Sequence, residues 1–345
     1  MPIAISRTSR DAGDARGERL PASTSCATFF AGGWGDRPVT RARACQLLRC
    51  GEEELDRLRA RGLPCWQHSR SQRYGYCDVM NAGLYSDSGR TLAELAARHI
   101  ARALDPARKH SEVPWTWQLS LTSQCPHGCT VGATPSAPQS SDRVAVLADW
   151  HIERDTATSV AWGATVAVHP CSSTVLDERV RSRYAQVLEE FDAGVVSYQY
   201  LPQALRRDPC AARALGVADC MTTALTLRSW CEQLKVPSRI RTGYILGLVC
   251  VEHVWLEVLD DDCFKPLDPV LTLLVRRSRN DDRAVAADFY LGSLPSCVLP
   301  WPVSAEPPLH AARCDHPDAT SSLIARLLAA GARRYPYPAT PRSSS

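Results

Sequence analysis

The chain lacks any long apolar run, although hydrophobic residues make up 45% of its 345 residues. A membrane-spanning helix needs about 20 consecutive apolar residues, and a secretory leader joins a basic start to a short apolar core. The chain shows neither pattern, so the sequence predicts no membrane partner. It also lacks an internal repeat, a phosphate-binding loop, a glycine fingerprint and a paired-carboxylate site, and we therefore expect no cofactor.

Lysine is nearly absent and occurs only as Lys109, Lys235 and Lys265, so arginine carries almost all of the positive charge. The 40 basic and 37 acidic residues leave a net charge of +3 at pH 7. A charge this small does not by itself indicate a nucleic-acid-binding protein.

Cysteine, in contrast, is abundant, with 15 residues. An odd number excludes a fully paired disulfide framework, and the cysteines are scattered through helical and strand-like segments, whereas disulfide scaffolds are small and loop-rich. We therefore expect a reducing, cytoplasmic location in which most of these thiols are inert core residues.

Composition divides the chain into four parts. Residues 1–36 are rich in Arg, Asp, Gly and Ser without periodicity and are expected to be a disordered lead, as is the tail 336–345. Between them we expect a small helical domain over 37–110 and a larger α+β domain over 111–335, with a loop at 133–142.

The small domain begins with two short helices joined by a tight turn at Cys50-Gly51, and an Arg- and Tyr-bearing hairpin follows. This order resembles the winged helix-turn-helix of the excisionase and MerR class. The resemblance implies DNA contacts by arginines of the second helix and the wing, which here are Arg57, Arg59, Arg61, Arg70 and Arg73. The alternatives are that these arginines form a solvated face or that the domain binds a peptide.

The larger domain opens with three strand-like runs, "WTWQLSLT", "RVAVLADWHIE" and "SVAWGATVAVH", and a helical pattern follows over 176–192. A second helix is predicted from Cys220, with Asp219 as its N-cap and Val236-Pro237 ending it. Cys220, Ala224 and Leu227 lie on one inward stripe of that helix. A cysteine at a helix N-terminus is either a packed core residue or a thiol whose pKa the helix lowers.

A hairpin follows this helix. The run 249–259 reads as a strand, and if Asp260 and Asp261 form the turn, His253 lies directly opposite Asp268. A thiol nucleophile needs a base to take its proton, and the base needs a group that fixes its tautomer. Cys220, His253 and Asp268 supply these types in that order.

The ordered set of motifs resembles the transglutaminase-like superfamily. It consists of "ADC" at 218–220, "VPSR" at 236–239, "GY" at 243–244, "HVWLEV" at 253–258 and "PLDP" at 266–269. Two positions depart from the usual pattern, since Val236 and Ser238 stand where Ile and Ala are common. The resemblance covers 185–275 and implies a papain-like core, in which a catalytic helix packs on an antiparallel sheet.

The resemblance also implies a catalytic triad of Cys220, His253 and Asp268. The oxyanion hole is expected to use the backbone N–H of Cys220, completed by a side chain from "SYQYLPQAL". Tyr198 and Gln199 are the candidates, with Tyr200 as a further one. Trp255 and Glu257 are expected to shape the strand.

The run "QCPHGC" (124–129) contains residue types that bind metals, since Cys125, His127 and Cys129 lie within five residues. Structural zinc usually takes two separated ligand pairs, and only Cys314 and His316 offer a second one. We therefore expect no metal.

Three functions follow from these patterns. The first is a thiol-dependent acyltransferase or amide hydrolase that acts on a peptide, amide or carrier-bound acyl substrate. The second is a DNA-binding regulator whose larger domain senses a ligand. The third keeps the enzyme and makes the helix-turn-helix a docking site for a peptide or carrier-protein substrate.

Overall fold

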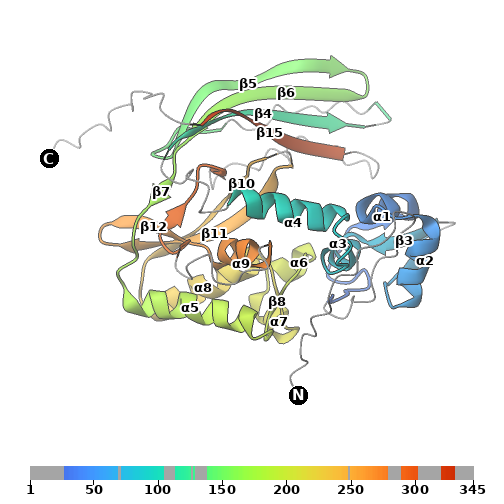
Figure 1. The fold of residues 1–345 in the computed structure, drawn as a ribbon, viewed down its shortest axis with the longest axis horizontal. Coiled ribbons are helices and arrows are strands. Elements are labelled where there is room, and N and C mark those ends of the chain that lie inside the picture. The colour runs from blue at the N-terminus through green and yellow to red at the C-terminus, as the bar shows by residue number, and fades with distance from the viewer. Residues whose placement is uncertain are drawn as a thin grey trace, which may run out of the picture.

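The computed structural model describes residues 27–68, 71–104, 113–125, 127–128, 138–247, 249–278, 289–301 and 320–330. The fold is α+β with antiparallel main sheets, as the sequence predicts. Figure 1 shows one four-stranded sheet along one edge of the molecule, helices α5 and α8 along the opposite edge, and the N-terminal helices to one side. No helix in the described ranges is long and apolar enough to cross a membrane.

The N-terminal region contains helices α1 (Arg41–Leu48), α2 (Glu52–Ala60), α3 (Tyr76–Leu84) and α4 (Leu92–Ala103), and strands β1 (Pro38–Thr40), β2 (Trp66–His68) and β3 (Ser71–Gly75). The strands form a sheet in the order β1-β3-β2. Local sequence explains these limits: the Thr40 hydroxyl accepts from Arg43 N at 3.1 Å to begin α1. Thr91 and Glu94 form a capping box at the start of α4.

The outer sheet has the order β15-β4-β6-β5 and consists of β4 (Trp115–Gln124), β5 (Val144–Thr156), β6 (Ser159–Val168) and β15 (Thr320–Ala330). Alternate residues of β4 are buried because one face of the strand packs on the core. The three strands expected over 111–170 are therefore present.

The central sheet has the order β12-β11-β10-β14 and is antiparallel throughout. Its strands are β10 (Ser238–Ile245), β11 (Val251–Asp260), β12 (Cys263–Leu267) and β14 (Val298–Trp301). Helices α5 (Glu178–Asp192), α8 (Cys220–Gln233) and α9 (Pro269–Ser278) pack around it. One large apolar core joins side chains of α4, α8, α9 and both four-stranded sheets.

Short elements complete the fold. They are β7 (Cys171–Ser172), β8 (Ser197–Tyr198), α6 (Gln203–Arg206), α7 (Pro209–Ala214), β9 (Val217–Ala218) and β13 (Ser293–Leu294). Strand β8 runs parallel to β9, which leads directly into α8. This pairing places 197–199 beside the beginning of the helix that carries Cys220.

The lead expected to be disordered over 1–36 contains anchored residues within 27–36, because Phe30 and Asp36 are buried. Phe30 is buried and belongs to an apolar cluster with Leu201 and Leu205. Asp36 accepts a hydrogen bond from Cys77 N at 3.1 Å, and Thr28 N donates to Gln199 Oε1 at 3.2 Å. The sequence does not indicate these anchoring residues, because they are few and the rest of the segment is polar and without periodicity. The rest of the lead and the tail 336–345 lie outside the described residues.

The boundary between the two expected domains is crossed by specific contacts. Asn81 of α3 is fully buried and binds the backbone of Tyr200: Asn81 Nδ2 donates to Tyr200 O at 3.0 Å, and Tyr200 N donates to Asn81 Oδ1 at 2.7 Å. The Tyr85 hydroxyl donates to Tyr198 O. Ile100 of α4 is part of the large core. The N-terminal region thus holds the strand segment next to α8.

Two buried carboxylates meet behind α3. A Cβ at Gly75 would lie 2.3 Å from Asp36 Oδ2 and 2.6 Å from Asp78 Oδ2, so both side chains converge on the space that glycine leaves open. Asp78 Oδ1 accepts from Phe30 N at 2.6 Å. Burial raises the pKa of Asp78 to about 6, and the neighbouring Asp36 adds to the rise.

Neutralising Asp78 is expected to stabilise the protein above its folded-state pKa. Between pH 4 and 6 the unfolded chain ionises this carboxyl more readily than the folded one, so stability falls as pH rises through that window. We predict that Asp78→Asn raises the free energy of unfolding by about 2 kcal/mol at pH 7.5 and changes it little at pH 4, as measured by urea unfolding.

Asp56→Asn is the control for this prediction, because a hydrogen bond from Arg41 lowers the pKa of Asp56 instead. That variant should lose stability at pH 7.5. A loss in Asp78→Asn at the same pH would contradict the prediction.

Candidate active site

Helix α8 places a thiol at its first turn. Asp219 caps the helix, because its Oδ1 accepts from Thr222 N at 2.8 Å and its own N–H donates to Thr222 Oγ1 at 2.8 Å. Cys220 is the next residue and is 6% exposed. Its backbone N–H is one of those that a helix start leaves without an intrahelical acceptor. The helix begins where the sequence predicts.

The turn of the following hairpin lies one residue later than expected. Asp261 and Asp262 form it, with φ values of 54° and 58°, which is the left-handed pair of a type I′ turn. Asp260 pairs with Cys263 and Leu256 with Leu267, so the prediction that His253 lies directly opposite Asp268 is wrong. Because the turn lies one residue later, each residue of β11 pairs with a residue of the other strand two positions later than expected.

A two-residue shift keeps side chains on the same face of the sheet. Extending the observed register by one pair would place Asp268 opposite Trp255, whose ring stacks on His253 with centroids 6.1 Å apart. His253 Nε2 contacts Asp268 Oδ2, so the two residues meet diagonally. Both are almost completely buried, at 3% and 1% exposure.

Asp268 holds two elements at once. Its Oδ2 faces His253, and its Oδ1 accepts from Leu271 N at 3.2 Å in the first turn of α9. Its backbone is also fixed, since Asp268 N donates to Tyr290 O at 3.2 Å and Tyr184 Oη donates to Asp268 O at 3.3 Å. The carboxylate therefore cannot turn away from His253 without uncapping α9.

Besides Asp268, the Cys220 thiol is the side chain that acts on the His253 imidazole. Because Nε2 faces Asp268, Nδ1 is the ring nitrogen left for the thiol. Burial lowers the pKa of His253, but the Asp268 carboxylate and the Cys220 thiol outweigh it and raise that pKa to about 10. The structure thus brings Cys220, His253 and Asp268 together in a buried chain that favours an imidazolium in the middle.

Tyr198 is the better placed of the two oxyanion candidates. Burial raises the pKa of Tyr198 far above its usual value, and the neighbouring Cys220 raises it further, so its hydroxyl stays protonated. Burial also raises the pKa of Tyr200, and Tyr76, Cys77 and Cys220 add to the rise. Gln199 is fully buried, with its Oε1 accepting from Thr28 N and its Nε2 donating to Ser197 Oγ at 3.0 Å.

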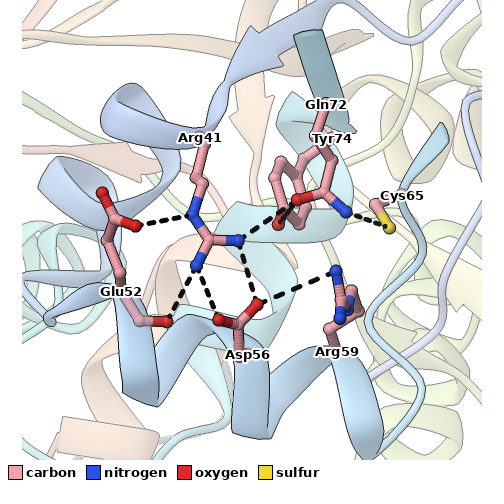
Figure 2. Close-up of polar contacts among 7 residues, drawn as sticks. All are labelled: Arg41, Glu52, Asp56, Arg59, Cys65, Gln72 and Tyr74. Carbon is pink, nitrogen blue, oxygen red and sulfur yellow. Dashed lines mark hydrogen bonds and ion pairs between the residues drawn. The ribbon is translucent and has the colours of Figure 1, made fainter. Parts of the chain in front are cut away.

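Two of the arginines expected to contact DNA, Arg57 and Arg59, lie on α2 among acidic residues. Arg57 pairs with Glu54 at 2.8 Å, and Arg59 approaches Asp56 at 3.8 Å. Figure 2 shows Asp56 shared between Arg59 and Arg41. These charges are therefore partly neutralised within the region.

The other expected contacts are dispersed. Arg61 is the C-cap of α2, Arg73 lies in β3 between Trp66 and Thr40, and Arg70 is outside the described residues. DNA or peptide binding by this region stays a prediction.

The structure describes only some of the residues that could have bound a metal at 124–129 and near 314–316. Cys125 is buried, and Cys129, Cys314 and His316 fall outside the described ranges. Within those ranges no group of three or more His, Cys, Asp or Glu residues is arranged to hold a metal ion.

Two residues near the site escape the sequence patterns. Asn81 lies 119 positions from the Tyr200 backbone that it binds, and Arg206 Nε lies 2.6 Å from Asp219 Oδ2. Neither belongs to a motif with regular spacing. The sequence offers one weak signal for Arg206, which is that it lies 13 positions before Asp219, the predicted N-cap.

No protein-family model matches the chain, and no curated protein matches it. A solved structure from Cytophaga hutchinsonii, described as "a Putative Cysteine Protease", is similar at a TM-score of 0.31 with 13% sequence identity. The match covers 63% of this chain and 91% of that one. At this TM-score the likeness carries no argument about this chain.

The charge on His253 has a measurable consequence for stability. The folded-state pKa of about 10 lies above the ordinary 6.5, so the stabilisation is complete below pH 6.5 and is lost as pH rises towards 10. Replacing Cys220 with serine removes the thiol's own titration. In that background the contribution of Cys220 to the raised pKa is lost, but Asp268 still raises the pKa of His253, so we predict that the free energy of unfolding falls by up to about 1 kcal/mol per pH unit as pH rises above 6.5.

The matched control is the double variant Cys220→Ser/His253→Gln, which has a neutral side chain of similar size. Urea unfolding at several pH values should show a shallower slope for the double variant. Parallel slopes would mean that His253 carries no extra proton in the folded state.

Proposed function

We propose that this protein is a thiol enzyme of the transglutaminase-like type, which transfers or hydrolyses acyl groups through a thioester on Cys220. The observation that carries the proposal is the buried chain Cys220–His253–Asp268, in which the imidazole contacts a carboxylate on one side and a helix-capped thiol on the other. Packing alone gives no reason to bury these three ionisable groups in contact.

In the resting site the proton of the Cys220 thiol already resides on His253, which is an imidazolium. The thiolate sulfur attacks the carbonyl carbon of an amide or ester, the new S–C bond forms, and the carbonyl electrons move to oxygen. The Cys220 backbone N–H and the Tyr198 hydroxyl are the donors available to that oxyanion. As the tetrahedral species collapses, the leaving amine or alcohol takes the proton from His253.

The thioester is resolved by water or by an amine. His253 Nδ1 removes a proton from the acceptor, which attacks the thioester carbonyl and releases the Cys220 sulfur. Water completes a hydrolysis, and an amine forms a new amide bond. Asp268 remains ionised throughout and keeps Nδ1 directed at the reacting atoms.

The surroundings of the site support the same proposal. Helix α8 packs on β10 and β11, which is the arrangement of a catalytic helix on an antiparallel sheet. The cysteines within the described ranges are free thiols, as expected for a reducing compartment such as the cytoplasm. Burial raises the pKa of Cys231, on the same helix, to about 11 and keeps it protonated.

Hydrolysis of a small ester tests the proposal, because a small probe can reach a thiol that is 6% exposed. With 4-nitrophenyl acetate, Cys220→Ser should lose at least about 100-fold in rate. Release of 4-nitrophenolate measures the rate. Cys231→Ser, which removes a buried thiol from the same helix, should retain the rate of the unaltered protein.

Asp268→Asn provides a second test, since asparagine can still cap α9 through its Oδ1. This variant should fold but lose at least about tenfold in rate, because the imidazole loses its charged partner. Unchanged hydrolysis in Cys220→Ser would show that Cys220 is a packed core residue.

A further inference from the structure

Arg206 touches the residue that precedes Cys220. Its Nε lies 2.6 Å from Asp219 Oδ2, while Asp219 Oδ1 caps α8. The two oxygens of one carboxylate thus divide between a guanidinium and the helix that carries the thiol. Asp219 is 5% exposed, so its charge has little water to stabilise it.

The Asp219 carboxylate creates a conflict at this site. A helix needs an N-cap, and an aspartate serves well, but its negative charge lies next to a sulfur that must also become negative. Two neighbouring anions disfavour each other. An adjacent cation can resolve the conflict without removing the cap.

We propose that Arg206 is a positioning residue of the thiol enzyme proposed above, whose guanidinium neutralises the Asp219 cap so that Cys220 can ionise beside it. The inference rests on the proposed function, since an unreactive thiol would need no such cation. Arg206 does not touch the reacting atoms, and it acts through Asp219 and through its charge.

The charged groups around the thiol agree with this role. Besides Asp219, Arg206 acts electrostatically on Cys220, on Tyr198 of β8 and on Glu252 of β11. Among the described residues, His253 and Tyr200 also interact with the thiol, and Asp268 lies behind His253. Arg206 is thus a second cation beside the imidazolium, and it opposes two carboxylates.

The experiment follows alkylation of Cys220 by iodoacetamide between pH 5 and 10, with the adduct quantified on the Cys220 peptide by mass spectrometry. The thiolate reacts, so the midpoint of the rate profile reports the thiol pKa. Arg206→Gln should raise this midpoint by about one unit and slow alkylation about tenfold below it. Arg206→Lys keeps the charge and should stay close to the unaltered protein.

Three further variants separate charge from structure. Asp219→Asn keeps a good N-cap but removes the anion, and should lower the midpoint. In Arg206→Gln/Asp219→Asn the midpoint should return most of the way to that of the unaltered protein. The matched control is Arg213→Gln. It breaks the ion pair that Arg213 of α7 forms with Glu190 of α5 at 2.6 Å. It should leave the profile unchanged.

The outcomes distinguish the two proposals. If Cys220 of the unaltered protein reacts no faster than Cys231, the thiol enzyme itself is wrong, and the role of Arg206 falls with it. If Cys220 is reactive but neither Arg206→Gln nor Asp219→Asn moves the midpoint, only the role of Arg206 is overturned. A double variant shifted as far as Arg206→Gln would also overturn it, because a purely structural role predicts no recovery.

Discussion

The contact between His253 and Asp268 is the constraint on which the site depends. Burying an unpaired imidazolium or carboxylate is costly, and here each is stable because the other faces it. Asp268 also caps α9, so the pair ties the end of β12 to the following helix. Removing either partner would leave a buried charge without compensation.

Different elements of the fold hold the residues on either side of the His253–Asp268 pair. Strand β11 lies between β10 and β12 in the central sheet, and His253 pairs with Gly243 of β10. On the other side of the imidazole, β9 leads into α8 and sets Cys220 at the helix start. The N-terminal region reaches the same place through Asn81, which fixes the backbone of Tyr200. Residues far apart in sequence thus support the group formed by Cys220, His253 and Asp268.

Local patterns predict much of this arrangement. Asp219 before an apolar stripe predicts the start of α8, and runs rich in β-branched and aromatic residues predict β4, β6 and β11. The register of the hairpin is not predictable in the same way, because the three consecutive aspartates 260–262 offer more than one position for a two-residue turn. The packing of 27–36 and the contacts of Asn81 and Arg206 depend on tertiary neighbours, which no local spacing encodes.

The most direct measurement of the central claim is the mass of the protein trapped during turnover. The chain is mixed with a small activated ester, quenched in acid within milliseconds to seconds, and digested at low pH. The account predicts a single acyl group on the peptide that contains Cys220, absent from Cys220→Ser and accumulating before the product reaches steady state. Acylation spread over exposed thiols such as Cys210 and Cys263, with none on Cys220, would contradict it.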